Sequence, residues 1–233
     1  MSRSAPTRNH GTRNTRSASK NLMQKTLSLQ ELSSWWHQYT PQRLLVVGSS
    51  NAGKSTFAHR LAQITGLPCF EIDDLAWQPG WQMHDLPVLR EKISQIVSQP
   101  QWILVGNYGS TQDISWPEAD LVIWLDLPKH LVMRRVLWRT CKRIGYRTPV
   151  CNGNYESFSR AFLHRDSLIL WVWNHFEPIR QRYQQRLTDK EIGIKPEFLR
   201  LTTAQEVRQC EVALRGLLQT RATQRTPPES TAR

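Results

Sequence analysis

One stretch of this sequence has the residue types and spacing of a phosphate-binding loop. It is Gly48-Ser-Ser-Asn-Ala-Gly53-Lys54-Ser55, which matches G-x-x-x-x-G-K-[ST] without a gap. In such loops the backbone N–H groups turn toward phosphate oxygens, and the positive end of the following helix adds to the attraction. We expect Lys54 to reach the β- and γ-phosphates, Ser55 to ligate Mg²⁺ and Thr56 to contact the α-phosphate. The motif therefore predicts binding of ATP or GTP with Mg²⁺, through Gly48, Ser49, Ser50, Asn51, Ala52, Gly53, Lys54, Ser55 and Thr56.

Two acidic residues, Asp73 and Asp74, stand just past a strand that we expect at 68–72. A carboxylate in this place can hold Mg²⁺ through water or orient the hydroxyl of a phosphate acceptor. We assign Asp73 to catalysis, metal binding and the acceptor site, and Asp74 to the acceptor site alone. The alternative is a helix cap or a solvated pair. Asp126 follows another expected strand, and because Pro128 comes next we expect it to cap a helix.

Three arginines recur at helical spacing in the stretch 128–144. Arg135, Arg139 and Arg143 are four residues apart, so they lie along one face of a helix. Guanidinium groups beside a phosphate site stabilise the charge of a transferring phosphoryl group, and we assign these three a catalytic role. A solvated face is the alternative. Arg165 is a weaker candidate of the same kind, placed with the acceptor.

Trp77 and Trp81 flank Gln78-Pro79-Gly80 in the loop after the acidic pair. Their rings could stack on a planar group, so we expect them to wall an acceptor pocket. The sequence has ten tryptophans, and most of the others are expected in the core, among them Trp102, Trp124, Trp171 and Trp173. The four cysteines show no C-x-x-C pair, which favours reduced, mostly buried thiols over a metal site.

The elements that must position these residues alternate between strands and helices. Short apolar runs predict strands, and helical periodicity with glycine stops at Gly66 and Gly145 predicts the helices between them. This order is typical of parallel α/β sheets, which bind ligands beyond the carboxyl ends of their strands. We expect one domain at 42–219, with strands at 43–48, 68–72, 102–105, 121–125 and 198–201, and helices at 54–65, 86–98, 128–144, 155–186 and from Thr203 onward.

The two ends of the chain differ in composition from the domain. Residues 1–27 are polar and basic, so we expect a disordered tail, and we expect another at 220–233. Ser28 and Glu31 have capping-box spacing, which predicts an amphipathic helix and linker at 28–41. The first thirty residues hold six basic and no acidic residues, out of a net charge of +12. The alternatives for this tail are a weak nucleic-acid-binding arm and a cleaved transit peptide.

The overall composition is that of a globular protein. The chain has 233 residues, of which 39% are hydrophobic and 21% are charged, so it is long enough to bury a core without disulfides. No apolar run reaches the roughly 18–20 residues that a bilayer-spanning helix needs, and the N-terminus lacks a secretory signal pattern. We expect a cytoplasmic monomer with no membrane contact and a small-molecule partner.

From about residue 43 to 218 the chain resembles the P-loop small-molecule kinases of the adenylate kinase-related group. Within that group it resembles bacterial proteins often labelled adenylate kinase-like or DNA topology modulation protein. Only the P-loop is specific by itself, and the order of the other motifs adds weight. Besides the P-loop and the arginine helix, the resemblance rests on Ile72-Asp73, Trp77 with Pro79-Gly80-Trp81, Gly106-Asn107-Tyr108, Trp116-Pro117 with Ala119-Asp120, Trp124-Leu-Asp-Leu-Pro128, Asn152-Gly153-Asn154 and Arg165-Asp166-Ser167 with Trp171.

The resemblance implies a P-loop NTPase fold, a three-layer α/β/α sandwich with a five-stranded, mainly parallel sheet. It also implies an arginine-bearing helical lid, here at about 139–160, and an acceptor site that includes Asn107 and Tyr108. The sequence departs from the group's pattern in two places. Val105 stands where a strand commonly ends in an acid, and Tyr155 stands where arginine is frequent.

These residues lead to one main hypothesis and two alternatives. The main hypothesis is an NTP-dependent phosphotransferase, similar to a nucleoside monophosphate kinase, that moves a γ-phosphoryl group from Mg-ATP to a small acceptor. The first alternative is a nucleotide-responsive protein that binds nucleic acid through the basic N-terminal arm. The second is a P-loop protein that binds nucleotide without turnover, for which Val105 is the only argument.

Overall fold

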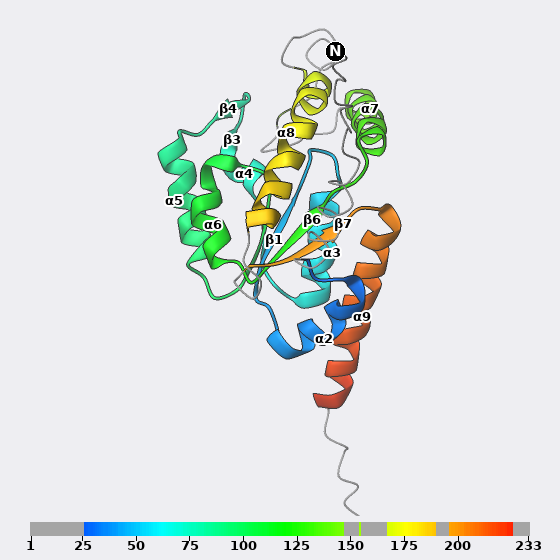
Figure 1. Ribbon diagram of the computed structural model, residues 1–233. Helices are drawn as coiled ribbons and strands as arrows, with labels where there is room; N and C mark the ends of the chain where they lie inside the picture. The colour runs from blue at the N-terminus through cyan, green and yellow to red at the C-terminus, as the bar shows by residue number, and fades with distance from the viewer. Residues whose placement is uncertain (1–25, 147–153, 155–166, 190–195, 226–233) are drawn as a thin grey trace, which may run out of the picture.

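The computed structural model describes residues 26–146, 154, 167–189 and 196–225. Its centre is a parallel five-stranded sheet in the order β2-β5-β1-β6-β7 (Figure 1). Helices cover both faces, so the predicted three-layer α/β/α fold with a P-loop between the first strand and the next helix is confirmed. The strands are β1 (Arg43–Gly48), β2 (Cys69–Glu71), β5 (Trp102–Val105), β6 (Leu121–Leu125) and β7 (Glu197–Leu201).

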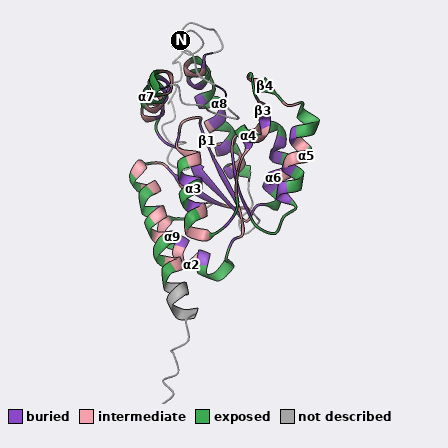
Figure 2. Ribbon diagram, turned by 180° about the vertical axis from the view of Figure 1, so that it is seen from behind, coloured by how far each residue is buried: buried purple, intermediate pink, exposed green. Residues whose placement is uncertain are grey.

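The central strands form where they do because their apolar side chains are buried on both faces of the sheet. Every residue of β5 and β6 is buried, as is every residue of β1 after Arg43. Figure 2 shows this as a band of buried residues between the helical layers. Continuous apolar runs of this kind are typical of parallel sheets, and β1, β5 and β6 occupy the predicted residues without a shift.

Among the described residues, three helices cover one face of the sheet. They are α2 (Leu29–Tyr39), α3 (Lys54–Thr65) and α9 (Ala204–Arg225). The core between them and the sheet includes Trp36, Phe57 and Leu214. The N-terminal helix begins as predicted, since Ser28 and Glu31 form a capping box with both hydrogen bonds present.

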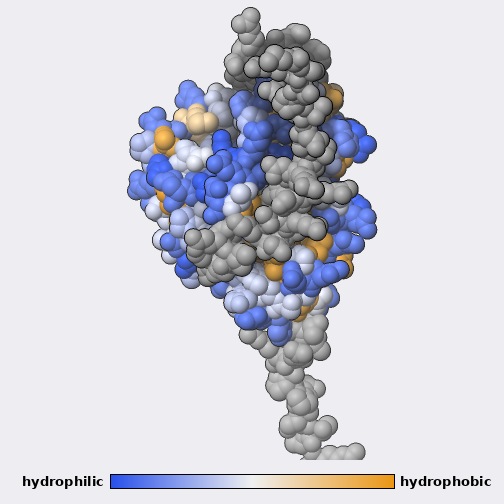
Figure 3. Space-filling model, viewed as in Figure 1, coloured by the Kyte–Doolittle hydropathy of each residue, from blue (hydrophilic) through white to orange (hydrophobic). Residues whose placement is uncertain are grey.

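On the other face, the described part of the chain forms four helices and one short hairpin. The helices are α4 (Ile72–Ala76), α5 (Leu86–Val97), α6 (Gln112–Glu118) and α8 (Leu168–Asp189), and β3 (Trp77–Gln78) pairs with β4 (Gln82–Met83). A 3-10 turn, η1 (Gly109–Thr111), precedes α6. Helix α7 (Lys129–Tyr146) packs on α8 through a smaller cluster that includes Val132, Val136 and Phe176. Where described residues are visible, Figure 3 shows a mainly hydrophilic surface with separate hydrophobic spots.

Several boundaries differ from the prediction. The second strand ends at Glu71, and Asp73 lies inside α4 because the chain turns helical directly after the sheet. Helix α7 continues through Gly145 to Tyr146, so the predicted stop there is wrong. The prediction of a continuous helix at 155–186 is also wrong, because Ser167 is not helical. The Ser167 hydroxyl accepts from the N–H of Leu170 at 3.2 Å, and α8 begins after this serine.

The tryptophans and cysteines divide between core and surface. Trp102 and Trp124 are buried as predicted, but Trp171 and Trp173 are 41% and 55% exposed on α8, so their core assignment is wrong. The buried face of this helix is taken instead by a row that includes Val172 and Phe176. The thiol of Cys210 is buried and that of Cys69 half-buried. Cys141 is exposed on α7, and Cys151 lies outside the described residues.

The predicted tails and lid fall largely outside the described residues. Leu27, placed in the N-terminal tail, pairs instead with the sheet edge, where its N–H donates to the carbonyl of Phe198 at 2.6 Å. At the other end, α9 continues past residue 219 to Arg225. In the described part of the chain, no helix combines the length and the apolar character needed to span a membrane.

Candidate active site

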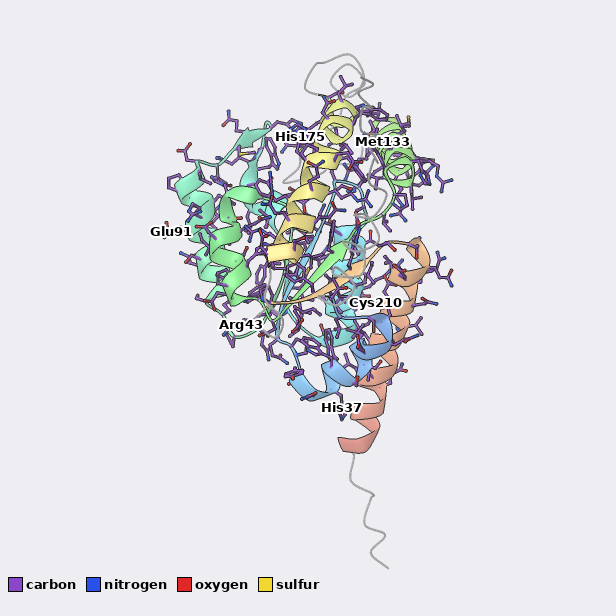
Figure 4. The ribbon with its side chains drawn as sticks, viewed as in Figure 1. His37, Arg43, Glu91, Met133, His175 and Cys210 are labelled. Carbon is purple, nitrogen blue, oxygen red and sulfur yellow. The ribbon has the colours of Figure 1, made fainter. Side chains whose placement is uncertain are left out.

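The P-loop lies at the carboxyl end of β1, between this strand and α3. In Figure 4, Arg43 marks the start of β1, while Met133 on α7 and His175 on α8 lie near the top of the view, the side toward which the strands run. Gly48 has φ +142°, and a Cβ there would lie 2.5 Å from the carbonyl oxygen of Leu125. Gly53 has φ +101°. Both glycines are therefore required by the backbone itself, as the motif predicts.

Lys54 opens α3 and folds back over the loop. Its Nζ donates to the carbonyl of Ser49 at 3.0 Å. Loss of solvent around this ammonium lowers the pKa of Lys54, while the nearby carboxylates of Asp73 and Glu71 act in the opposite direction. The structure therefore brings Lys54 and Asp73, predicted from separate motifs, into one electrostatic neighbourhood.

Two of the three predicted arginines reach the loop from α7. Arg135 Nη1 donates to the carbonyl of Ala52 at 2.7 Å, and Arg139 Nη1 donates to Oδ1 of Asn51 at 3.2 Å. Burial lowers the pKa of Arg135, and the neighbouring Arg134 lowers it further. Arg143 lies half-buried one turn beyond Arg139, and Arg165 lies outside the described residues.

A carboxylate that we did not predict stands beside Ser55. Glu71, the last residue of β2, accepts from Ser55 Oγ through Oε2 at 2.6 Å, and its Oε1 lies 2.8 Å from Nε2 of His59. The chain has Val105 where the resemblance leads us to expect an acid, and Glu71 pairs with that residue in the sheet. A carboxylate is therefore present beside position 105, but it comes from Glu71 on the neighbouring strand β2. No linear pattern indicated Glu71, because strand register and the facing side of α3 place it.

The donor set fits Mg²⁺. The Ser55 hydroxyl and carboxylates are hard oxygen ligands, and protein sites usually hold this ion through one or two carboxylates together with substrate phosphates and waters. Among the described residues, no three His, Cys, Asp or Glu side chains form a group able to hold a metal by themselves.

The predicted acidic pair is solvent-accessible. Asp73 and Asp74 are exposed on α4. Partial burial raises the pKa of Asp74, the charges of Glu71 and Asp73 raise it further, and His59 opposes them. The carboxylates of β2 and α4 therefore form one acidic group that faces the cationic P-loop.

Trp77 and Trp81 lie together on the β3–β4 hairpin. Their ring centroids are 5.6 Å apart in an edge-to-face arrangement, and both residues are half-buried. Asn154, which belongs to the predicted lid, is hydrogen-bonded to both sides of the hairpin turn. Its side chain accepts from the N–H of Trp81 at 2.9 Å and donates to the carbonyl of Gln78 at 2.9 Å. These two bonds connect a residue of the predicted lid to the predicted acceptor wall.

Asn107 is engaged with the P-loop, a role that we did not predict. Its Oδ1 accepts from the N–H of Gly48 at 3.0 Å and from the hydroxyl of Tyr183 at 2.8 Å, and its Nδ2 donates to the carbonyl of Gly48. The amide thus ties the start of the loop to α8. Tyr108, the next residue, packs against the adjoining core.

Asp126 does not cap α7, so the predicted cap is wrong. The helix begins at Lys129, and the buried carboxylate instead accepts from both Nε and Nη2 of Arg200, with Arg180 Nε 2.9 Å away. Two guanidinium groups around one carboxylate hold β6, β7 and α8 together beside the site.

No family model matches the chain, and no curated protein matches it. Among solved structures, the chain is similar to a gluconokinase from Sinorhizobium meliloti 1021, with 18% identity over 80% of this chain and 98% of that one and a TM-score of 0.40. It is similar to the shikimate kinase from Acinetobacter baumannii, with 13% identity over 84% and 99% and a TM-score of 0.46. It is also similar to the shikimate kinase from Aquifex aeolicus, with 11% identity over 78% and 98% and a TM-score of 0.45.

Proposed function

We propose that this protein is an NTP-dependent phosphotransferase, similar to a nucleoside monophosphate kinase, that moves the γ-phosphoryl group of ATP or GTP to a small acceptor. The observation that carries the proposal is the convergence of cations on the P-loop. Lys54, Arg135 and Arg139 each hydrogen-bond to an oxygen of the loop, where a polyphosphate would replace those partners.

Each of these groups would have its own role in phosphoryl transfer. The loop amides and the N-terminal end of α3 would bind phosphate oxygens. The positive charges of Arg135 and Arg139 would stabilise the negative charge of the transferring phosphoryl group. Mg²⁺ bound with the triphosphate would neutralise further phosphate charge. Asp73 would hold a hydroxyl of the acceptor, which is the attacking group of a nucleoside or an alcohol and a ribose hydroxyl of a nucleoside monophosphate, with Trp77 and Trp81 as the wall against which the acceptor lies.

The acidic side of the site supports an acceptor that presents a hydroxyl. Asp73 and Asp74 are exposed next to the half-buried tryptophans, so a neutral hydroxyl can be bound there by carboxylate oxygens. The paired rings favour a ligand with a flat apolar part, such as a nucleobase.

The test is a panel of acceptors with Mg-ATP and Mg-GTP. Nucleoside monophosphates, nucleosides and small alcohols are supplied in turn, and ADP or GDP formation is measured for the wild type and for Lys54→Ala. Lys129→Ala is the matched control, because it removes a lysine that lies 3.9 Å from the ring of Trp173 on α8. We expect acceptor-dependent turnover that is lost in Lys54→Ala and kept in the control.

Diphosphate formation independent of any acceptor would contradict the kinase assignment. Absence of heat on titrating wild-type protein with either triphosphate in magnesium buffer would contradict nucleotide binding itself.

A further inference from the structure

Three side chains form a hydrogen-bonded row between α3 and the end of β2. Ser55 Oγ donates to Glu71 Oε2 at 2.6 Å, and His59 Nε2 lies 2.8 Å from Glu71 Oε1. Ser55 and His59 are one helical turn apart, so both face the same strand. The carboxylate of Glu71 is 20% exposed and the ring of His59 is 59% exposed, so the row runs from the P-loop outward to solvent.

The first bond decides which way the Ser55 hydroxyl points. A hydroxyl has one proton and two acceptor lone pairs, and it can ligate a cation only through a lone pair. The short bond to the carboxylate keeps the hydroxyl proton of Ser55 directed at Glu71. The lone pairs are then left for a cation, whereas a freely rotating hydroxyl would turn its proton toward the cation site for part of the time.

The second bond decides how the carboxylate of Glu71 lies. His59 and Ser55 occupy different oxygens of the same group, so the carboxylate is held at both ends. This matters because Glu71 stands on β2, at the level of Val105 on β5. The side chain of Val105 is buried and contains no oxygen. Of these two paired residues, Glu71 is therefore the one that places an acid beside Ser55.

We propose that His59 is a positioning residue that acts through Glu71 to hold the Ser55 hydroxyl for the Mg²⁺ of a bound nucleotide. This inference rests on the proposed function, because it requires the P-loop to bind a metal–nucleotide complex. Partners behind a metal ligand typically change metal affinity by about 10- to 100-fold, and an exposed partner such as His59 belongs at the lower end.

The test separates metal-dependent from metal-independent binding. Calorimetry on the full chain gives the affinity for ATP with excess Mg²⁺ and with EDTA, and the ratio of the two measures what the metal contributes. We expect His59→Ala to lower this ratio by about 10-fold while leaving the EDTA affinity unchanged. His59→Gln keeps a donor and should recover part of the ratio. Arg60→Ala is the matched control, because Arg60 lies next to His59 on α3 and its exposed guanidinium pairs with Glu211 of α9.

A double-mutant cycle shows whether His59 works through Glu71. Glu71→Ala should lower the ratio more than His59→Ala does, partly because removing a negative charge near Lys54 strengthens metal-free ATP binding. Adding His59→Ala to Glu71→Ala should then have no further effect. Mn²⁺ with ADP, followed by electron paramagnetic resonance, gives a second readout of metal affinity that needs no turnover.

Two results would overturn the inference. One is an unchanged ratio in His59→Ala, which includes an equal loss of affinity with and without the metal and would then indicate a general effect on folding. The other is a full additional loss in the double variant. In each of these cases wild-type binding of Mg-ATP leaves the proposed function standing, whereas wild-type protein that binds no triphosphate refutes both.

Discussion

Replacing Gly48 by alanine tests whether the P-loop backbone is fixed by steric contact with β6. The residue has φ +142°, a region that is nearly restricted to glycine and costs other residues about 1–3 kcal/mol. The added Cβ would also lie 2.5 Å from the carbonyl oxygen of Leu125. The obstacle is backbone, so two paired strands must move apart, and overpacking of this kind adds about 1–3 kcal/mol.

Gly66 provides a matched control. It also has a positive φ, +76°, at the end of α3, but a Cβ there meets nothing within 4 Å. Gly66→Ala restricts the unfolded chain as much as Gly48→Ala does. In the folded state its cost is that of holding alanine in a left-handed conformation, about 1 kcal/mol. We therefore expect Gly48→Ala to lower the free energy of unfolding by about 1–5 kcal/mol more than Gly66→Ala does.

Urea denaturation followed by circular dichroism measures this difference, provided that the slopes of the two variants agree. Triphosphate affinity measured in the same buffer should fall in Gly48→Ala and stay at the wild-type value in Gly66→Ala. If the two variants unfold within about 1 kcal/mol of each other, the contact with Leu125 does not constrain the loop and the steric reasoning is wrong.

Three further predictions concern the groups around the loop. Asn107→Ala should lower the free energy of unfolding by about 2–4 kcal/mol, because it leaves the buried Tyr183 hydroxyl without its acceptor. Tyr183→Phe removes the donor as well and should cost only about 1 kcal/mol. Chemical denaturation of the two variants measures the difference. Asp126→Ala should cost about 3–5 kcal/mol, since it leaves Arg200 without its buried partner, and a loss below 1 kcal/mol in the same assay would contradict that role. Because the pKa of Lys54 is lowered, its ammonium loses its proton at a lower pH than an ordinary lysine. Triphosphate affinity measured by calorimetry should therefore fall early on the alkaline side, while Lys54→Arg should keep its affinity there.

The sheet and the P-loop could be predicted from the sequence because local signals and tertiary burial agree there. The run from Leu44 to Val47 is apolar without interruption, and α3 lies between two glycines with positive φ, Gly53 and Gly66. Helix α6 was not predicted, because it is short and contains Pro117. The β3–β4 hairpin was missed for a similar reason, since strands of two residues carry no periodicity.

The site was predictable in part, and the division follows from how each residue is placed. Lys54 and Ser55 belong to a contiguous motif, and Arg135 and Arg139 are marked by helical spacing, so the sequence indicates all four. Glu71 is placed by strand register and by the facing side of α3, neither of which a linear pattern states.

Asn107 was assigned to the acceptor by resemblance, yet both ends of its amide bind the loop backbone and Tyr183. The reason is physical: a strand-end asparagine beside β1 lies within hydrogen-bond distance of both the N–H and the carbonyl of Gly48, the first loop residue. A residue type at a strand end indicates nearness to the ligand, and only the neighbouring strands decide whether its polar atoms are directed to the ligand or to the loop that holds it.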